Sequence, residues 1–148
     1  KIKNYPTWLF SALIGRAVPF TGTAGIQYEK MSQEEVIVSL KNRRKVRNHI
    51  GQIHAAGMIL LAETATGMVV GMNVPDDKVP LIKSMKTNFV KRSTGAMRAV
   101  AHLSAEQIEK IKTLEKGEVQ VPVTVTDEVG VEPVLVEAIW AWIPKKKQ

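Results

Sequence analysis

Residues 48–63 read NHIGQIHAAGMILLAE, from Asn48 to Glu63, and this stretch decides how the rest of the chain is organised. From His54 to about Met72 the apolar residues recur with the period of a helix. They fall on more than one face, with Met58, Leu61, Ala65 and Val69 on one side and Ile59 and Val70 on another. A helix that is apolar nearly all round must be buried, so the pattern predicts a central helix over residues 54–72.

The segments before this helix indicate one further helix and two strands. An N-terminal helix is expected within residues 1–18, with Pro6 in its first turn and Pro19 as its stop. Residues 22–30 and 34–46 are predicted as strands, because apolar and polar side chains alternate in the second of them.

The segments after the central helix are mostly strand-like. Residues 82–93 and 96–103 are predicted as two strands joined by a hairpin at Thr94-Gly95. A capping box from Ser104 to Gln107 opens a helical insert over residues 104–116. Residues 119–125 alternate strictly, with Pro122 indicating an edge or a bulge, and residues 134–142 alternate along a long last strand.

This order favours an α+β domain of residues 1–148 in which an antiparallel sheet wraps around one long central helix. Such a sheet leaves free edges, and pairing of two sheets in a dimer is one way to cover them. The chain has no cysteine, so it cannot form disulfides. At 148 residues it is long enough to bury a full hydrophobic core without them.

The composition of the chain indicates which classes of binding partner to expect. The net charge is +7, with basic residues gathered in three clusters: residues 43–47, residues 83–92 and residues 145–147. An anionic partner is therefore plausible, but no aromatic residues are interleaved with the clusters, which argues against nucleic acid. Three scattered histidines without cysteine argue against a metal site, and no apolar run is long enough to span a membrane. We expect a cytoplasmic protein.

Glu63 and His54 are the residues that could carry chemistry. A carboxylate in a buried helix is costly unless it is paired or protonated, so Glu63 either bonds cations or backbone groups in the core or has a perturbed pKa suited to catalysis. His54, at the helix start, is either a capping or core histidine or a catalytic one. Asn48 taken alone is a turn residue.

The spacing of these residues resembles that of the hot-dog fold acyl-coenzyme A thioesterases, especially the small enzymes of the phenylacetate-degradation type. Their pattern is an Asn, a His-Gly-Gly six residues later at the helix start, and an acid nine residues after the His. Asn48, His54-Ala55-Ala56 and Leu61-Ala62-Glu63 keep these intervals. The segment from Ser84 to Gly95 is similar to the family's strand that ends in a basic residue and a turn.

The resemblance implies an acyl-CoA thioesterase that acts as a homodimer or a dimer of dimers. Glu63 would be the general base or nucleophile, Asn48 would position water or the carbonyl, and His54 would support the turn. The backbone N–H of Ala55 or Ala56 would form the oxyanion hole. Ser84 would bond the water or Glu63, and Lys91 and Arg92 would meet the phosphates of coenzyme A, which is part of the substrate, so that no separate cofactor is expected.

A two-chain site follows from the spacing together with the resemblance. Glu63 lies eight residues after Ala55, or about 12 Å along a helix that rises ~1.5 Å per residue. One chain cannot bring both groups to one carbonyl, so the helix start and Asn48 would come from one protomer and Glu63 from the other.

Two departures from the family pattern leave alternatives open. His-Gly-Gly is His-Ala-Ala here, and the usual Asp is Glu63. The alanine methyls narrow the approach of a thioester to the backbone, which is compatible with a protein that binds acyl-CoA without cleaving it. A hot-dog hydratase or dehydratase is the other alternative, because His49 and Glu63 have the fourteen-residue interval of that branch.

Overall fold

The computed structural model describes residues 6–146, with only the backbone described for Phe10. Two helices come first, α1 (Thr7–Ala17) and α2 (Pro19–Ala24), followed by the strands β1 (Gln27–Met31) and β2 (Glu35–Leu40). A short 3-10 turn, η1 (Arg44–Val46), leads to the long helix α3 (Ala55–Gly71). The remaining elements are β3 (Lys78–Phe89), β4 (Met97–His102), α4 (Ala105–Thr113), β5 (Gly117–Val121), β6 (Val123–Asp127) and β7 (Val134–Pro144).

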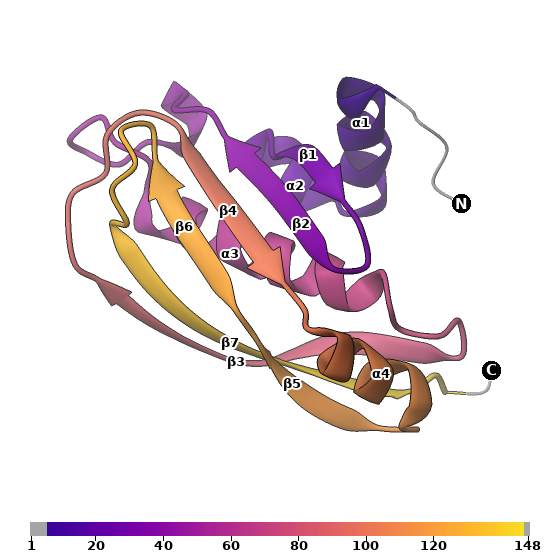
Figure 1. Ribbon diagram of the computed structural model, residues 1–148. Coiled ribbons are helices and arrows are strands. Elements are labelled where there is room, and N and C mark those ends of the chain that lie inside the picture. The colour runs from indigo at the N-terminus through magenta and orange to yellow at the C-terminus, as the bar shows by residue number, and fades with distance from the viewer. Residues whose placement is uncertain (1–5, 147–148) are drawn as a thin grey trace.

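The strands form two antiparallel sheets that one segment of chain connects. Their orders are β1-β2-β4-β6 and β3-β7-β5. β5 and β6 are consecutive and are separated only by Pro122, so the chain leaves one sheet and enters the other at this residue. A proline has no N–H to give to a ladder, which explains why the pairing changes partner there. Figure 1 shows the resulting curved sheet with α3 running behind β2, β4 and β6.

The core lies between this sheet and α3. Leu61, Ala65 and Val69 of the helix are fully buried, and so are the inward residues Val36 and Val38 of β2. On β7, whose alternation the sequence predicts, Trp140 and Trp142 are both buried. The Trp140 indole donates a hydrogen bond of 2.8 Å to the Thr66 hydroxyl of α3. The predicted architecture, an antiparallel sheet around one long central helix with an N-terminal helix, is confirmed.

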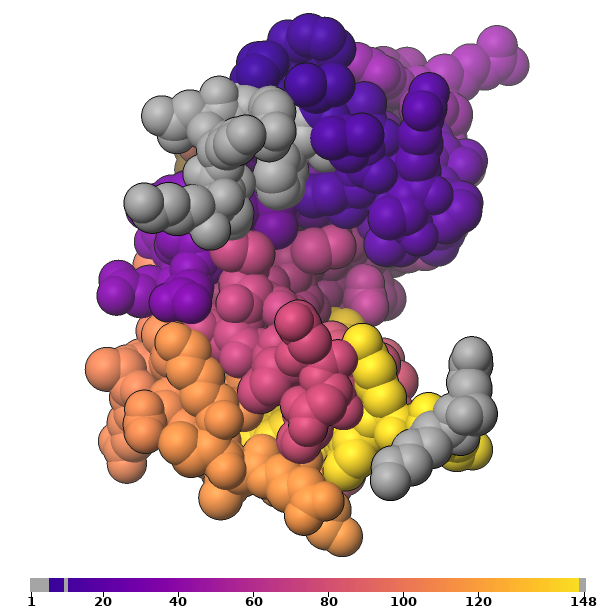
Figure 2. Space-filling view, turned by 90° about the vertical axis from the view of Figure 1, so that its right-hand side faces the viewer, coloured from indigo at the N-terminus to yellow at the C-terminus, as the bar shows by residue number. Residues whose placement is uncertain are grey.

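The helices at the ends of the molecule cap the sheet. Figure 2 shows α1 and α2 (indigo) at one end of a face and α4 with β5 (orange) at the other. The capping box of α4 is present as predicted, because the Ser104 hydroxyl accepts from the Gln107 N–H and the Gln107 side chain accepts from the Ser104 N–H. No helix in the part of the chain described here is long and apolar enough to cross a membrane. Lys147, which belongs to the last basic cluster, lies outside the described residues.

Several local predictions were wrong. The strand expected from residue 22 begins only at Gln27, because Pro19 opens the helix α2 instead of merely ending α1. Gly25 then ends α2 in the left-handed conformation, with φ of 82°. The hairpin at Thr94-Gly95 does not form, since β3 pairs with β7 while β4 pairs with β2 and β6. The second predicted strand also ends early, at Leu40.

Candidate active site

The loop of residues 47–53 leads into the central helix and is organised by Asn48. Its side-chain oxygen accepts hydrogen bonds from the N–H groups of Ile50 (3.0 Å) and Gln52 (3.1 Å). Because both partners are donors, the orientation of the amide is settled and its NH₂ group points elsewhere. Asn48 can therefore act on a ligand only as a hydrogen-bond donor.

A second set of contacts pins the tip of this loop. The guanidinium of Arg47 donates to the Asn42 side-chain oxygen (2.9 Å) and to the Asn42 carbonyl (3.2 Å). Asn42 in turn donates to the carbonyl of Gly51 (3.1 Å), a residue with φ of 78° that favours glycine. The His54 N–H donates to the Val46 carbonyl at 2.8 Å, so the start of α3 is fixed against η1.

His54 is the N-cap of α3. Its Nδ1 accepts a hydrogen bond of 2.9 Å from the N–H of Ala56, while its carbonyl accepts from Gly57 and Met58. Ala55 is the remaining donor of the first turn, and its N–H has no partner among residues 6–146. Of the two N–H groups predicted for the oxyanion hole, that of Ala55 is thus open and that of Ala56 is engaged by the cap.

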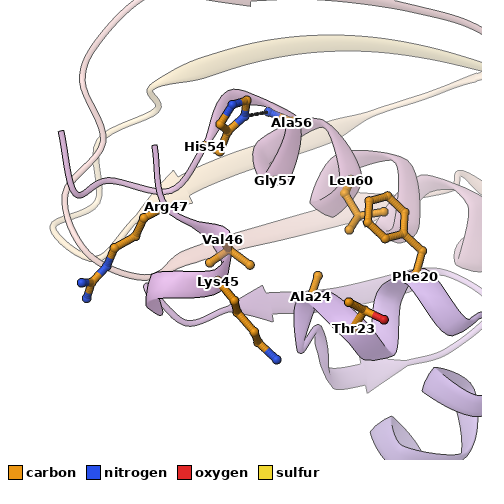
Figure 3. Close-up of a pocket in the computed structure, with 10 residues that line it drawn as sticks. All are labelled: Phe20, Thr23, Ala24, Lys45, Val46, Arg47, His54, Ala56, Gly57 and Leu60. Atoms are coloured by element: carbon orange, nitrogen blue, oxygen red, sulfur yellow. Dashed lines mark hydrogen bonds between the residues drawn. The ribbon is translucent and has the colours of Figure 1, made fainter. Parts of the chain in front are cut away.

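An apolar cavity of about 330 Å³ lies beside this first turn, between α2, η1 and α3 (Figure 3). One end is formed by His54 and Ala56, and Phe20 of α2 faces Leu60 of α3 across it. Asn48, Ala55 and Glu63 are not among its lining residues, which are Phe20, Thr23, Ala24, Lys45, Val46, Arg47, His54, Ala56, Gly57 and Leu60.

Glu63 lies in the third turn of α3 and is half-buried. Its carboxylate forms no ion pair and no hydrogen bond within the described range of the chain, so the expected alternative, a carboxylate satisfied by core cations or backbone groups, is not what this structure contains. Burial raises the pKa of Glu63 above its ordinary value, because water no longer stabilises the charge. A carboxylate of this kind accepts a proton more readily than an exposed one, as a general base must.

Tyr28 of β1 is a candidate that the sequence analysis missed. Its side chain is 2% exposed, and its hydroxyl has no hydrogen-bond partner among the described residues. Burial raises the pKa of Tyr28, the nearby Thr21 side chain lowers it, and the charge of Glu63 raises it further. The hydroxyl of Thr64, the residue after Glu63, is also buried without a partner. Tyr28 thus places a buried hydroxyl close enough to Glu63 for the charge of the carboxylate to act on it.

The helix itself sets the spacing of the site. α3 is unbroken from Ala55 to Gly71, so the open N–H of Ala55 and the side chain of Glu63 are separated by about 12 Å along its axis. The structure therefore brings Asn48, His54 and Ala55 together at the helix start and leaves Glu63 two turns away in the same chain.

The predicted substrate-binding residues lie elsewhere on the surface. Ser84 is exposed on β3, next to an irregularity in the pairing with β7. Lys91 and Arg92 are exposed in the segment between β3 and β4, where the Lys91 N–H donates to the Pro133 carbonyl (3.2 Å). None of the three lines the cavity beside the helix start. No group of three or more potential metal ligands occurs among the residues that the structure describes.

Comparison with known proteins shows which family and fold this chain resembles. The model of a family described as a domain of unknown function, DUF4442, matches residues 6–143. No curated protein matches the chain. A protein of unknown function from Pseudomonas aeruginosa, described as a probable thioesterase, is 25% identical with a TM-score of 0.83, over 95% of this chain and 97% of that one.

Two more distant structures share the fold. A thioesterase from Haemophilus influenzae is 14% identical with a TM-score of 0.71, over 99% of this chain and 96% of its own. A thioesterase family protein from Silicibacter pomeroyi is 14% identical with a TM-score of 0.72, over 95% and 100% of the two chains. The predicted hot-dog fold is thereby confirmed.

Proposed function

The chain belongs to the DUF4442 family, and from that premise we propose that it is an acyl-CoA thioesterase whose active sites each lie between two copies of the chain. One observation carries the proposal. The open N–H at the start of α3 and the unpaired, half-buried Glu63 lie on the same unbroken helix, too far apart to act on one carbonyl. Two antiparallel copies bring the helix start of one chain to the Glu63 of the other.

In this proposal the thioester carbonyl accepts a hydrogen bond from the Ala55 N–H. The oxygen then lies at the positive end of the α3 dipole, where negative charge developing in the transition state is stabilised. The free NH₂ group of Asn48 supplies a second donor to the carbonyl or to the attacking water.

Glu63 of the second chain removes the proton in the same mechanism. As general base it takes a proton from water while the oxygen of that water adds to the carbonyl carbon. Collapse of the adduct breaks the carbon–sulfur bond, and the proton passes from Glu63 to the departing thiolate. Direct attack by the Glu63 carboxylate, followed by hydrolysis of the anhydride, is the other route that the same placement permits.

The free edge of β3 supports assembly of two copies. β3 pairs with β7 on one side, and no described strand pairs with its other side. It exposes apolar side chains along this edge, with 47% of Leu81, 41% of Ile82 and 51% of Phe89 accessible. A long edge strand that exposes apolar side chains is a template for pairing with another chain, and a two-fold dimer would cover it with the same strand of the partner.

The residues Ala55 and Ala56 favour one alternative, an acyl-CoA binding protein without turnover. Ala56 lines the cavity, so its methyl occupies space at the place where the thioester would approach the backbone. In that case the helix start would still hold the acyl group, and Glu63 would have no chemical task.

Release of free thiol from short, medium, long and aromatic acyl-CoAs separates these functions. Wild type is compared with Glu63→Ala and Asn48→Ala, and the oligomeric state of each is measured in parallel. Turnover that both substitutions abolish without dissociating the oligomer supports the thioesterase. Tight acyl-CoA binding with no thiol release from any ester supports the binding protein and contradicts the thioesterase.

A further inference from the structure

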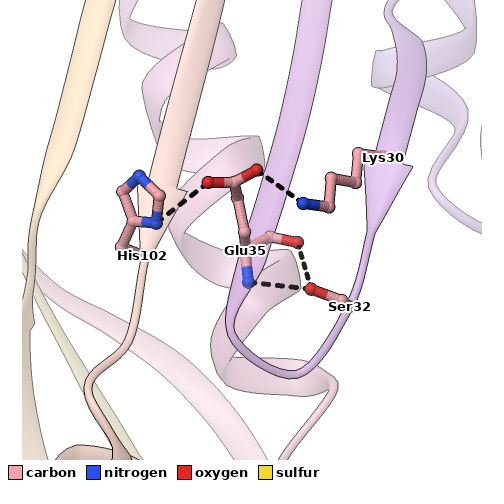
Figure 4. A network of polar contacts seen from close by, with 4 residues as sticks. All are labelled: Lys30, Ser32, Glu35 and His102. Atoms are coloured by element: carbon pink, nitrogen blue, oxygen red, sulfur yellow. Dashed lines mark hydrogen bonds and ion pairs between the residues drawn. The ribbon is translucent and has the colours of Figure 1, made fainter.

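The basic cluster next to the cavity forms no ion pairs within residues 6–146. Arg43, Arg44 and Lys45 are exposed, and none of them forms an ion pair with a described carboxylate. Several other surface cations are paired with carboxylates. Figure 4 shows Lys30 with Glu35, which also contacts His102, and further pairs join Arg98 to Glu29 and Lys78 to Asp77.

Two of these free cations converge on one point above Gly25. The Lys45 Nζ and the Arg43 Nη1 lie 3.5 Å and 3.7 Å from the position that a Cβ on Gly25 would occupy. Gly25 has φ of 82°, a conformation that excludes most side chains, so the space beneath the two charges stays open. Arg47, in contrast, has its guanidinium bonded to Asn42 and is committed to holding the loop.

Like charges that converge without a carboxylate repel each other, and this is costly unless an anion binds between them. The C-terminal end of α2 lies at Gly25, and the partial negative charge of its carbonyl groups attracts a cation. A helix of only six residues has a weak dipole, which is not enough to hold two cations at this point. The arrangement is therefore better explained by a ligand with negative charge than by the fold alone.

The position of Lys45 connects the two cations to the candidate active site. Lys45 lines the cavity, and its neighbour Val46 accepts the hydrogen bond from the His54 N–H. Figure 3 shows the His54–Ala56 cap at one end of the lining residues and the Lys45 ammonium extending from another side, beside Thr23 and Ala24. An elongated ligand with a charged end at Lys45 can thus reach the helix start through an apolar passage.

We infer that Arg43 and Lys45 bind the phosphate groups at the nucleotide end of an acyl-CoA, whose pantetheine arm occupies the cavity beside α3. This inference rests on the proposed function and goes beyond it by naming the residues that read the phosphates. The guanidinium of Arg43 suits two phosphate oxygens at once, and the Lys45 ammonium adds a point charge. It assigns to Arg43 and Lys45 the role that the family resemblance implies for Lys91 and Arg92.

The test measures binding of free coenzyme A by calorimetry, which needs no hydrolysis. The double variant Arg43→Gln/Lys45→Gln is compared with Lys112→Gln/Lys116→Gln, which removes the same charge from exposed residues at the α4 end of the molecule. We expect the first variant to bind coenzyme A at least about tenfold more weakly, because it loses two charge-assisted contacts, and the second to bind like wild type.

A kinetic arm separates the two proposals. With the same acyl group on coenzyme A and on N-acetylcysteamine, Arg43→Gln/Lys45→Gln should raise KM only for the coenzyme A ester and leave kcat unchanged. If no ester is hydrolysed but coenzyme A binding is lost in this variant, the phosphate site stands and the thioesterase fails. If turnover occurs while binding and KM are unchanged, or if only Lys91→Gln/Arg92→Gln weakens binding, the inference is overturned.

Discussion

The Nδ1 atom of His54 accepts a hydrogen bond of 2.9 Å from the backbone N–H of Ala56. A neutral imidazole that accepts at Nδ1 carries its proton on Nε2, so this contact also sets the tautomer of His54. It satisfies one of the N–H groups that every helix start leaves without a partner. The Ala55 N–H beside it has no partner in the part of the chain that the structure describes, and the histidine thereby selects which backbone group can polarise a carbonyl.

His54→Ala should destabilise the chain by about 1 kcal/mol, the usual cost of losing an N-cap side chain, and should lower turnover because the Ala55 N–H is no longer held in place. His54→Asn is the matched control, since its side-chain oxygen can cap the same helix. Urea unfolding and thiol release measure both effects. If the asparagine variant recovers stability but not turnover, His54 acts through its Nε2–H and not through the cap.

Glu63→Gln should raise the free energy of unfolding at pH 8 and leave it unchanged near pH 4. Burial raises the pKa of Glu63 in the folded chain, so the folded state holds this proton more tightly than the unfolded state. The free energy of unfolding therefore falls as pH rises from the ordinary value of 4.5 through the raised pKa, and stays lower above it. The amide that Glu63→Gln introduces is uncharged at every pH, so its burial carries no penalty for desolvating a charge. Thermal unfolding at pH 4, 6 and 8 tests this, and a difference that is the same at each pH would contradict it.

Tyr28→Phe should leave the protein as stable as wild type or more stable, and should reduce kcat. The buried hydroxyl has no partner among the described residues, and a buried polar group without one costs about 1–3 kcal/mol. We expect it to be kept as a hydrogen-bond donor to Glu63 or to the water that Glu63 activates. Loss of stability with unchanged kcat would show instead that the hydroxyl serves the fold.

Gly67→Ala should destabilise the protein by roughly 1–3 kcal/mol through overpacking. A Cβ at this position would lie 2.6 Å from the Trp140 ring, and that ring is held by its hydrogen bond to Thr66. Gly71→Ala is the control on the same helix, because a Cβ there meets nothing within 4 Å. Since alanine is a better helix former than glycine, Gly71→Ala should leave the free energy of unfolding unchanged or raise it. Equal losses in both variants would rule out the contact with Trp140 as the cause.

The sequence predicts the elements whose patterns are long and regular. The helical period from His54 to Met72 locates α3 within one residue at each end, and the alternation from Val134 to Trp142 identifies the inward face of β7. These patterns are strong because each places many side chains against one core. The spacing from Ala55 to Glu63 likewise predicts how far apart the two residues lie, because helix geometry converts sequence spacing within α3 directly into distance.

Short and non-local features could not be predicted in this way. Pro19 stops one helix and starts another, and a local pattern does not distinguish these roles. The turn signal at Thr94-Gly95 was overridden because β3 and β4 find partners far away in the chain. Tyr28 becomes a candidate only when the fold brings β1 to Glu63, and the use of the Ala56 N–H by His54 depends on a rotamer.

Subunit complementation tests the two-chain site most directly. Glu63→Ala and Asn48→Ala, each inactive alone, are unfolded together, refolded and assayed for thiol release. A mixed dimer carries one site with both residues intact and one with neither, so random pairing in a two-fold dimer should restore about a quarter of the wild-type activity. Recovery near that level is the result that the two-chain account predicts. No recovery, in a mixture shown to contain the mixed dimer, would contradict it and place both residues in the site of a single chain.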